Sequence, residues 1–311
     1  MGGGVRPRTP LGSRAIEVRH SFTNVAGVKI HWAEAGPATS ATPVVLLHGL
    51  QDCHRTWRRV VSLLGRERRV LMPDLPGHGL SERPDVAYDL PWYARMTEAW
   101  LDAIGLAEVD VVGHSLGGGI AQMLLLERRD RIRRLVLAAS GGLGREITSL
   151  LRLASIPLVV ERFGQPFFSM GTRLALRGVL TPEDLAELSA MNGRVGSARA
   201  FARTVHDLID WRGQRRSFSL RAHEIRTLPP IAVIWGKRDR VIPVKHAEAL
   251  ADLLDGIEVT LLEGCGHYLH HEQPEPFARV VRTFLDAPVA SAARLRRAPS
   301  HGPWLTSCTS C

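Results

Sequence analysis

The feature that most constrains the fold is a series of short apolar runs without polar alternation. An unbroken run of this length is typical of a strand that is covered on both faces in a parallel sheet. By contrast, residues 27–34 alternate apolar and polar side chains, which predicts a strand with one exposed face. The unbroken runs occupy residues 43–49, 68–75, 109–115, 134–140, 231–236 and 257–264.

Segments with helical periodicity lie between these runs. The segment 91–106 starts at Pro91 and stops at Gly105, and its apolar residues share one stripe of a helix. Residues 274–285 repeat this pattern behind Pro274. Strands that alternate with helices predict an α/β fold with a doubly wound, mostly parallel sheet.

The alternation stops between residues 141 and 228, where helix-like segments follow one another without a convincing buried strand. An insertion of this length predicts a helical cap at 141–228 on a core formed by 21–140 and 229–286. Residues 1–20 are predicted to form a flexible lead and 287–311 a disordered tail. The large apolar side chains of the cap are predicted to wall a substrate pocket: Phe163, Phe167, Phe168, Met170 and Trp211.

The chain of 311 residues is strongly basic, with a formal net charge of +9. Its cations are scattered and accompany no recognised nucleic-acid-binding module, so we expect a solvated basic surface and no nucleic-acid partner. No segment approaches the roughly 18 to 20 apolar residues of a membrane span. The first residues lack the apolar centre of a secretory signal, and we expect a cytoplasmic protein.

Two of the four cysteines, Cys308 and Cys311, form a closely spaced pair at the end of the chain. The pair lacks the second pair of ligands that a structural zinc site needs. We therefore expect two free thiols and no metal.

The strongest chemical signal is Gly113-His114-Ser115-Leu116-Gly117, between a buried run and a predicted helix. A serine hydroxyl becomes a useful nucleophile only when it is exposed and next to a base. A sharp strand-to-helix turn exposes it, and small residues two before and two after leave room for that turn. We predict Ser115 as the nucleophile.

The candidate base is His267, in a loop just after the last apolar run. Gly264 and Gly266 allow this loop to place the imidazole over the carboxyl edge of the sheet, where Ser115 is expected. His270 and His271 are expected to cap or solvate the final helix instead.

The candidate orienting acid is Asp239, which follows the run at 231–236. Such a residue holds the tautomer of the base and stabilises its cation. Taken alone, Asp239 is as well explained by a surface ion pair with Arg238 or Arg240. The order serine, acid, histidine along the chain favours the catalytic interpretation.

Two backbone amides are candidates for the oxyanion hole. Leu116 follows the serine at the start of a helix, whose dipole favours negative charge. Leu50 lies in the loop after the run at 43–49. We interpret His48, in the same loop, as a brace rather than a proton carrier.

These motifs together resemble the α/β-hydrolase superfamily, in its serine-nucleophile branch with a helical cap. The resemblance covers about 230 residues and includes LLHGL (46–50), DLPGHGLSERP (74–84), VGHSLGGG (112–119), WGKRDRVIP (235–243) and GCGHYLHHEQPEPF (264–277). It implies a hydrolase without a cofactor, with Ser115, Asp239 and His267 as the triad and Leu50 and Leu116 as oxyanion donors.

The predicted function is hydrolysis of carboxylic esters or related acyl compounds, with an apolar small molecule as substrate. The stretch 140–147 and the loop around His267 are also similar to carbon–carbon bond hydrolases of meta-ring-fission products. That family usually carries asparagine where this chain has His114, and its first loop has more glycine and serine than Leu50-Gln51-Asp52. Ligand reception without turnover is a further alternative on this fold. The sequence does not specify the oligomeric state.

Overall fold

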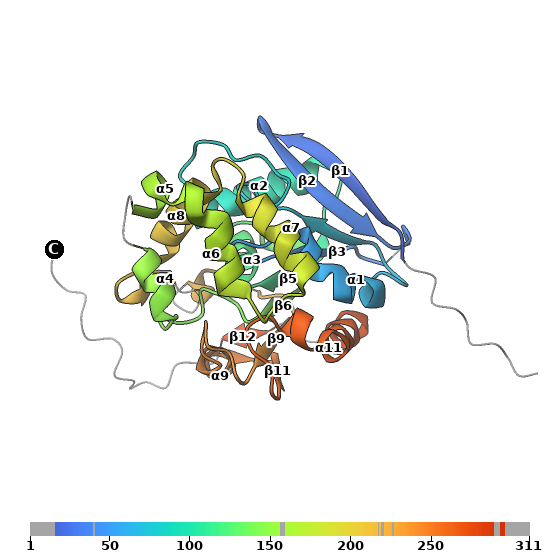
Figure 1. Cartoon of the computed structure of the whole chain (residues 1–311). Coiled ribbons are helices and arrows are strands. Elements are labelled where there is room, and N and C mark those ends of the chain that lie inside the picture. Colours follow the sequence, from blue (N-terminus) through green and yellow to red (C-terminus); the bar gives the residue numbers. More distant parts are fainter. Residues whose placement is uncertain are drawn as a thin grey trace, which may run out of the picture.

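The computed structural model describes residues 16–39, 41–155, 159–216, 218, 221–225, 227–288 and 293–295. Their central element is an eight-stranded sheet with the order β1-β2-β4-β3-β5-β6-β9-β11. All neighbours from β4 to β11 run parallel, whereas β1 and β2 form an antiparallel hairpin on one edge. Figure 1 shows the hairpin lying along the border of the molecule. The predicted α/β fold is confirmed.

The interior strands coincide with the unbroken apolar runs. They are β3 (Val44–Leu47), β4 (Val70–Pro73), β5 (Val109–His114), β6 (Ile132–Ala138) and β9 (Ile231–Gly236). Nearly every residue in them is buried, because each strand has neighbours on both sides and helices over its faces. The carboxyl ends of these parallel strands meet at one edge of the sheet, and the loops that carry the predicted site follow there.

Two strands differ from their sequence predictions. Residues 27–34 were expected to form a strand with an exposed face, but β2 (Val28–Ala35), between β1 (Val18–Val25) and β4, is mostly buried. Both of its faces are covered, since Trp100 packs on Trp32 and His54 packs on His31. The run at 257–264 was expected to be covered on both faces. Its strand β11 (Glu258–Leu262) ends the sheet and is largely exposed, because it has a neighbour on one side only.

Helices flank this sheet. The main ones are α1 (Arg58–Leu64), α2 (Leu90–Ala103), α3 (Leu116–Glu127), α9 (Lys245–Leu253) and α11 (Pro274–Asp286). Helix α2 begins where the Asp89 carboxylate accepts a hydrogen bond from the Trp92 amide, and α3 is buried along almost its whole length. Helices α1 and α11 pack against each other, as do α2 and α3.

The segment between β6 and β9 contains no strand of the large sheet among its described residues. It holds α4 (Ser149–Ala154), α5 (Val159–Phe163), α6 (Phe168–Leu176), α7 (Pro182–Asn192) and α8 (Ser197–Leu208), with a small β7–β8 hairpin. Figure 1 shows these helices grouped on one side of the sheet. The arrangement fits the predicted cap, whose boundaries at 141 and 228 stay a prediction.

Both predicted flexible ends overlap ordered elements. Strand β1 begins at Val18, inside the predicted lead, because its residues pair in register with β2 from Val18 opposite Ala35 onward. Strand β12 (Arg294–Leu295) falls inside the predicted tail and pairs with β10 (Leu254–Asp255). Cys308 and Cys311 lie outside the described residues.

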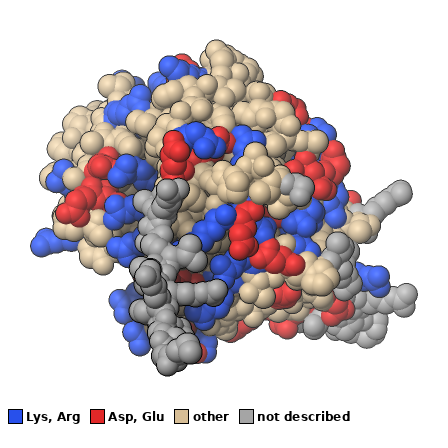
Figure 2. All heavy atoms as spheres, turned by 90° about the vertical axis from the view of Figure 1, so that its right-hand side faces the viewer, with Lys and Arg blue, Asp and Glu red and all other residues tan. Residues whose placement is uncertain are grey.

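Many arginines of this basic chain are held in ion pairs with carboxylates. Examples are Arg203 with Glu161, Arg216 with Asp207, and Arg69 with Glu34. Figure 2 shows basic and acidic side chains intermixed on the face that it presents. Within the described helices, none combines the length and the apolar character that a membrane span requires.

Candidate active site

Ser115 occupies a strained turn between β5 and α3. Its φ of 53° and ψ of −114° lie where side chains other than glycine are rare. The turn requires close approaches of backbone: a Cβ on Gly113 would come within 2.6 Å of the Gly117 carbonyl oxygen, and one on Gly117 within 2.2 Å of Leu47 O. The glycines noted in the sequence are therefore needed where they stand.

The predicted oxyanion amides border the same cavity as this serine. Leu116 is the first residue of α3, whose initial N–H groups have no partner within the helix. Leu50 lies in the loop after β3, and Ser115, Leu50 and Leu116 all line one cavity. In the described part of the chain, no hydrogen bond engages the amide of Leu50. The role of both amides as oxyanion donors stays a prediction.

His267 and Asp239 meet over the carboxyl edge of the sheet. Nδ1 of His267 donates a hydrogen bond to Oδ2 of Asp239 over 2.8 Å. The other carboxylate oxygen accepts the amides of Val241 and Ile242 at 2.8 and 2.9 Å. The Asp239 side chain is buried, so the alternative of a surface ion pair with its neighbouring arginines does not describe its position.

His114 connects this pair to the serine turn. It directly precedes Ser115, and its Nε2–H donates to the carbonyl oxygen of His267 over 3.0 Å. The rings of His114 and His267 have centroids 4.9 Å apart. Among the described residues, no hydrogen bond joins the Ser115 hydroxyl to His267. Such contacts often tighten only when substrate binds.

His48 acts as a brace in this structure. Its Nδ1–H donates to Gly49 O at 2.8 Å, and its Nε2 accepts the amide of Leu75 at 3.0 Å. Burial lowers the pKa of His48 to about 4, so the ring stays neutral at neutral pH. A neutral ring with both nitrogens engaged holds the Leu50 loop against the loop after β4.

His270 and His271 were expected to cap or solvate the last helix, and this prediction is wrong. Both are buried in α10 (Leu269–Glu272), where their Nε2 atoms share the Thr56 hydroxyl at 2.7 and 2.9 Å. The reason is tertiary: α10 packs against the short helix η1 (His54–Trp57), which the local sequence does not reveal.

The cavity beside Ser115 is mainly apolar, and the space within it and its open mouth together is about 560 Å³. Its walls include Ile147 in the loop before α4, Leu151 of α4, Leu208 of α8 and Ile242 in the loop after β9. The cap residues predicted to wall it do not line it. Phe163, Phe167, Met170 and Trp211 are each more than half exposed, and Phe168 packs on Phe201.

Arg216 is a wall residue that the sequence analysis did not find. It is half-buried at the cavity, and its guanidinium pairs with the Asp207 carboxylate through two hydrogen bonds. No local motif marks it, because only the fold of the cap brings residue 216 to the serine. Arg145, another arginine of the segment 141–228, is exposed.

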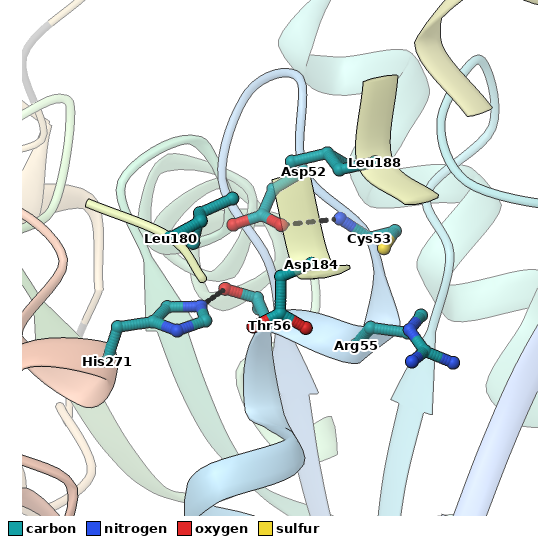
Figure 3. Close-up of a pocket in the computed structure, with 8 residues that line it drawn as sticks. All are labelled: Asp52, Cys53, Arg55, Thr56, Leu180, Asp184, Leu188 and His271. Atoms are coloured by element: carbon teal, nitrogen blue, oxygen red, sulfur yellow. Dashed lines mark hydrogen bonds between the residues drawn. The ribbon is translucent and has the colours of Figure 1, made fainter. Parts of the chain in front are cut away.

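A second, smaller hollow lies where α7 meets η1 (Figure 3). Asp52, Thr56, Asp184 and His271 surround it, and Figure 3 shows Asp52 bonded to the Cys53 amide and His271 to Thr56. Asp184 is also paired with Arg58. Its one thiol, Cys53, is buried, and burial raises the pKa of that thiol well above its ordinary value, so the cavity at Ser115 is the better candidate for substrate.

The mostly parallel sheet and the strained serine turn after β5 define the α/β-hydrolase class. The sequence model of the α/β hydrolase fold matches residues 42–274, and the chain belongs to this family.

Relatives include a 2-hydroxymuconate semialdehyde hydrolase of Pseudomonas sp. (strain CF600), which is 32% identical over 86% of this chain and 94% of its own. Uncharacterized protein Rv2715 of Mycobacterium tuberculosis is 32% identical over 85% of this chain and 80% of its own. Among solved structures, a serine hydrolase involved in carbazole degradation (CarC enzyme) superposes with a TM-score of 0.71. Its identity is 25%, covering 86% of this chain and 99% of that chain.

Proposed function

We propose that the protein is a serine hydrolase that cleaves apolar esters or related acyl compounds through Ser115, His267 and Asp239. The observation that carries this proposal is the hydrogen bond from His267 Nδ1 to the buried Asp239 carboxylate. A second hydrogen bond, from His114 Nε2–H to the carbonyl oxygen of His267, ties the histidine loop to the residue that directly precedes Ser115. With Nδ1 protonated, Nε2 is the basic nitrogen, as a general base for the serine requires.

The reaction proceeds in two acyl-transfer steps. Ser115 Oγ attacks the substrate carbonyl while His267 Nε2 takes the hydroxyl proton, and the oxyanion is bound by the amides of Leu50 and Leu116. Each such donor lowers the barrier by about 3 kcal/mol. The leaving group departs with the proton from His267, and water then repeats the sequence on the acyl-enzyme.

The walls of the cavity favour an apolar acyl group. Leu151, Leu208 and Ile209 face the space beside Ser115, and few polar groups interrupt them. Burying each methylene of a substrate there contributes about 0.8 kcal/mol. Esters with acyl chains that fill the cavity should therefore be preferred over acetate.

Replacement of the nucleophile tests the proposal. Ser115→Ala should abolish turnover of p-nitrophenyl esters and labelling by a fluorophosphonate, while circular dichroism stays unchanged. The matched control is Ser149→Ala, at an exposed serine of α4, which should keep both. Normal labelling of Ser115→Ala would refute the assignment.

A second candidate function is carbon–carbon bond hydrolysis of a dienoate carboxylic acid. It is supported by Arg216 on the cavity wall, where a guanidinium suits a carboxylate, and by the hydrolase relative from Pseudomonas. Arg216→Met should then lower kcat/KM for a ring-fission dienoate by about tenfold or more and leave a neutral ester unaffected. An equal kcat/KM for the dienoate in the parent protein and in Arg216→Met would remove this candidate.

A further inference from the structure

Three histidines converge on the side of the sheet that carries the β1–β2 hairpin. His20 lies on β1, His31 on β2 and His54 in η1, and their ligand nitrogens all lie within 4.8 Å of one another. Nδ1 of His20 is 3.1 Å from Nε2 of His31. The three ring centroids are 4.7 to 5.3 Å apart. The segments meet only through the fold, so no sequence motif announces the cluster.

These spacings are those of ligands around one tetrahedral ion. Zinc binds imidazole nitrogen at about 2.0–2.1 Å, which places two such nitrogens about 3.3 Å apart and their ring centroids about 5 Å apart. The 3.1 Å between His20 Nδ1 and His31 Nε2 and the three centroid separations lie near these values, and the remaining nitrogen pairs lie within 4.8 Å. His20 is exposed, whereas His31 and His54 are buried.

The carboxylate of Asp74 sets the orientation of the two buried rings. Its Oδ2 accepts Nδ1–H of His31 at 2.8 Å, and its Oδ1 accepts Nδ1–H of His54 at 2.9 Å. A carboxylate on Nδ1–H leaves Nε2 unprotonated as a ligand, and such carboxylate–histidine pairs recur around zinc.

We propose that His20, His31 and His54 bind a divalent transition metal ion, with Zn²⁺ as the fitting ion and Asp74 as the residue that orients two of the ligands. Imidazole ligands suit zinc and its neighbours in the first transition row rather than Mg²⁺ or Ca²⁺. Three protein ligands leave a fourth position, which water can take.

The site is separate from the cavity at Ser115. Strands β4 and β3 lie between β2 and β5, so His31 is three strand spacings, about 14 Å, from the strand that carries the serine.

A bound ion joins the edge hairpin to η1, whose His54 lies shortly after the Leu50 loop. An ion that binds only the folded chain raises its stability.

Titration with ZnCl₂ tests the site in the full chain, with Cys308→Ser and Cys311→Ser in every protein so that the terminal thiols do not compete. The parent should bind a single Zn²⁺ in calorimetry and gain thermal stability. Added CoCl₂ should produce the visible absorption of tetrahedral cobalt. His20→Ala, at an exposed position, should weaken Zn²⁺ binding by about 10- to 100-fold or more and remove the cobalt band.

Two controls separate this site from other binding. His223→Ala removes an exposed histidine outside the cluster and should leave the titration unchanged. Cys53→Ser tests the rival set of Cys53, His54 and Asp74, whose ligand atoms also lie within 4.8 Å of one another, and should likewise have no effect. Undiminished binding in His20→Ala, loss in Cys53→Ser, or no binding by the parent would each overturn the proposal.

Discussion

His267 and Asp239 are joined by a hydrogen bond of 2.8 Å, and the carboxylate is fixed from its other oxygen by two backbone amides. The acid therefore cannot turn away from the imidazole without losing three hydrogen bonds. Its burial strengthens its interaction with a histidine cation, because little water screens the charge.

This relationship predicts the effect of removing the charge of Asp239. In Asp239→Asn, the amide can stabilise neither the required tautomer nor the cation of His267, so kcat for an ester substrate should fall by about 10⁴-fold. KM should change little. Steady-state kinetics would measure the loss of kcat, with Asp252→Asn, at an exposed aspartate of α9, as the matched control. Similar losses of kcat in both variants would contradict the orienting role of Asp239.

The cavity wall predicts a change in acyl-chain preference. Leu151 lines the cavity on α4, whereas the next residue before it, Leu150, is 65% exposed. Leu151→Phe should narrow the cavity and lower kcat/KM for octanoate esters by about tenfold relative to acetate esters. Leu150→Phe is the matched control and should keep the ratio of the parent. Equal ratios in both variants would show that this wall does not contact the acyl chain.

The serine turn predicts a position-specific effect of a single methyl group. Gly117→Ala places a Cβ 2.2 Å from Leu47 O, a clash with backbone that the tightly paired β3 cannot relieve. We expect a loss of about 3 kcal/mol or more in the free energy of unfolding. Gly171→Ala, where nothing lies within 4 Å, should instead be neutral or stabilise the chain by up to about 1 kcal/mol. Urea denaturation compares the two, and equal midpoints would contradict the strained-turn interpretation.

Buried neutral histidines predict loss of stability in acid. Burial lowers the pKa of His48 and His271 to about 4 and that of His78 to about 3, all below the value of about 6.5 in an unfolded chain. Because the unfolded state binds protons first, the free energy of unfolding falls as the pH drops from 6.5 toward 4, by roughly 2 kcal/mol per histidine between pH 7.5 and pH 5.

Unfolding midpoints in urea across this pH range measure the effect. His271→Gln should flatten the dependence, whereas His223→Gln, at an exposed histidine, should leave it as it is in the parent. A parent protein as stable at pH 5 as at pH 7.5 would be inconsistent with neutral buried rings.

The local sequence was sufficient to predict the strands of the parallel core and the turn that carries Ser115. Runs such as 109–115 and 231–236 lack polar alternation, and that pattern has few solutions other than a strand buried on both faces. The paired glycines around Ser115 likewise express a backbone requirement that acts within a few residues. The catalytic roles of Ser115, Asp239 and His267 stay predictions from motif order, with geometry that supports them.

Tertiary structure alone decided which side chains share a space. Strand β2 was expected to have an exposed face but is mostly buried. Phe163, Phe167 and Trp211 of the predicted cap are exposed to solvent, whereas Arg216 lines the cavity. The histidines at 20, 31 and 54 meet only because an edge hairpin and a loop pack against each other. Periodicity encodes which face of a segment is apolar, but not what that face contacts, since contacts between distant segments depend on how the whole chain packs.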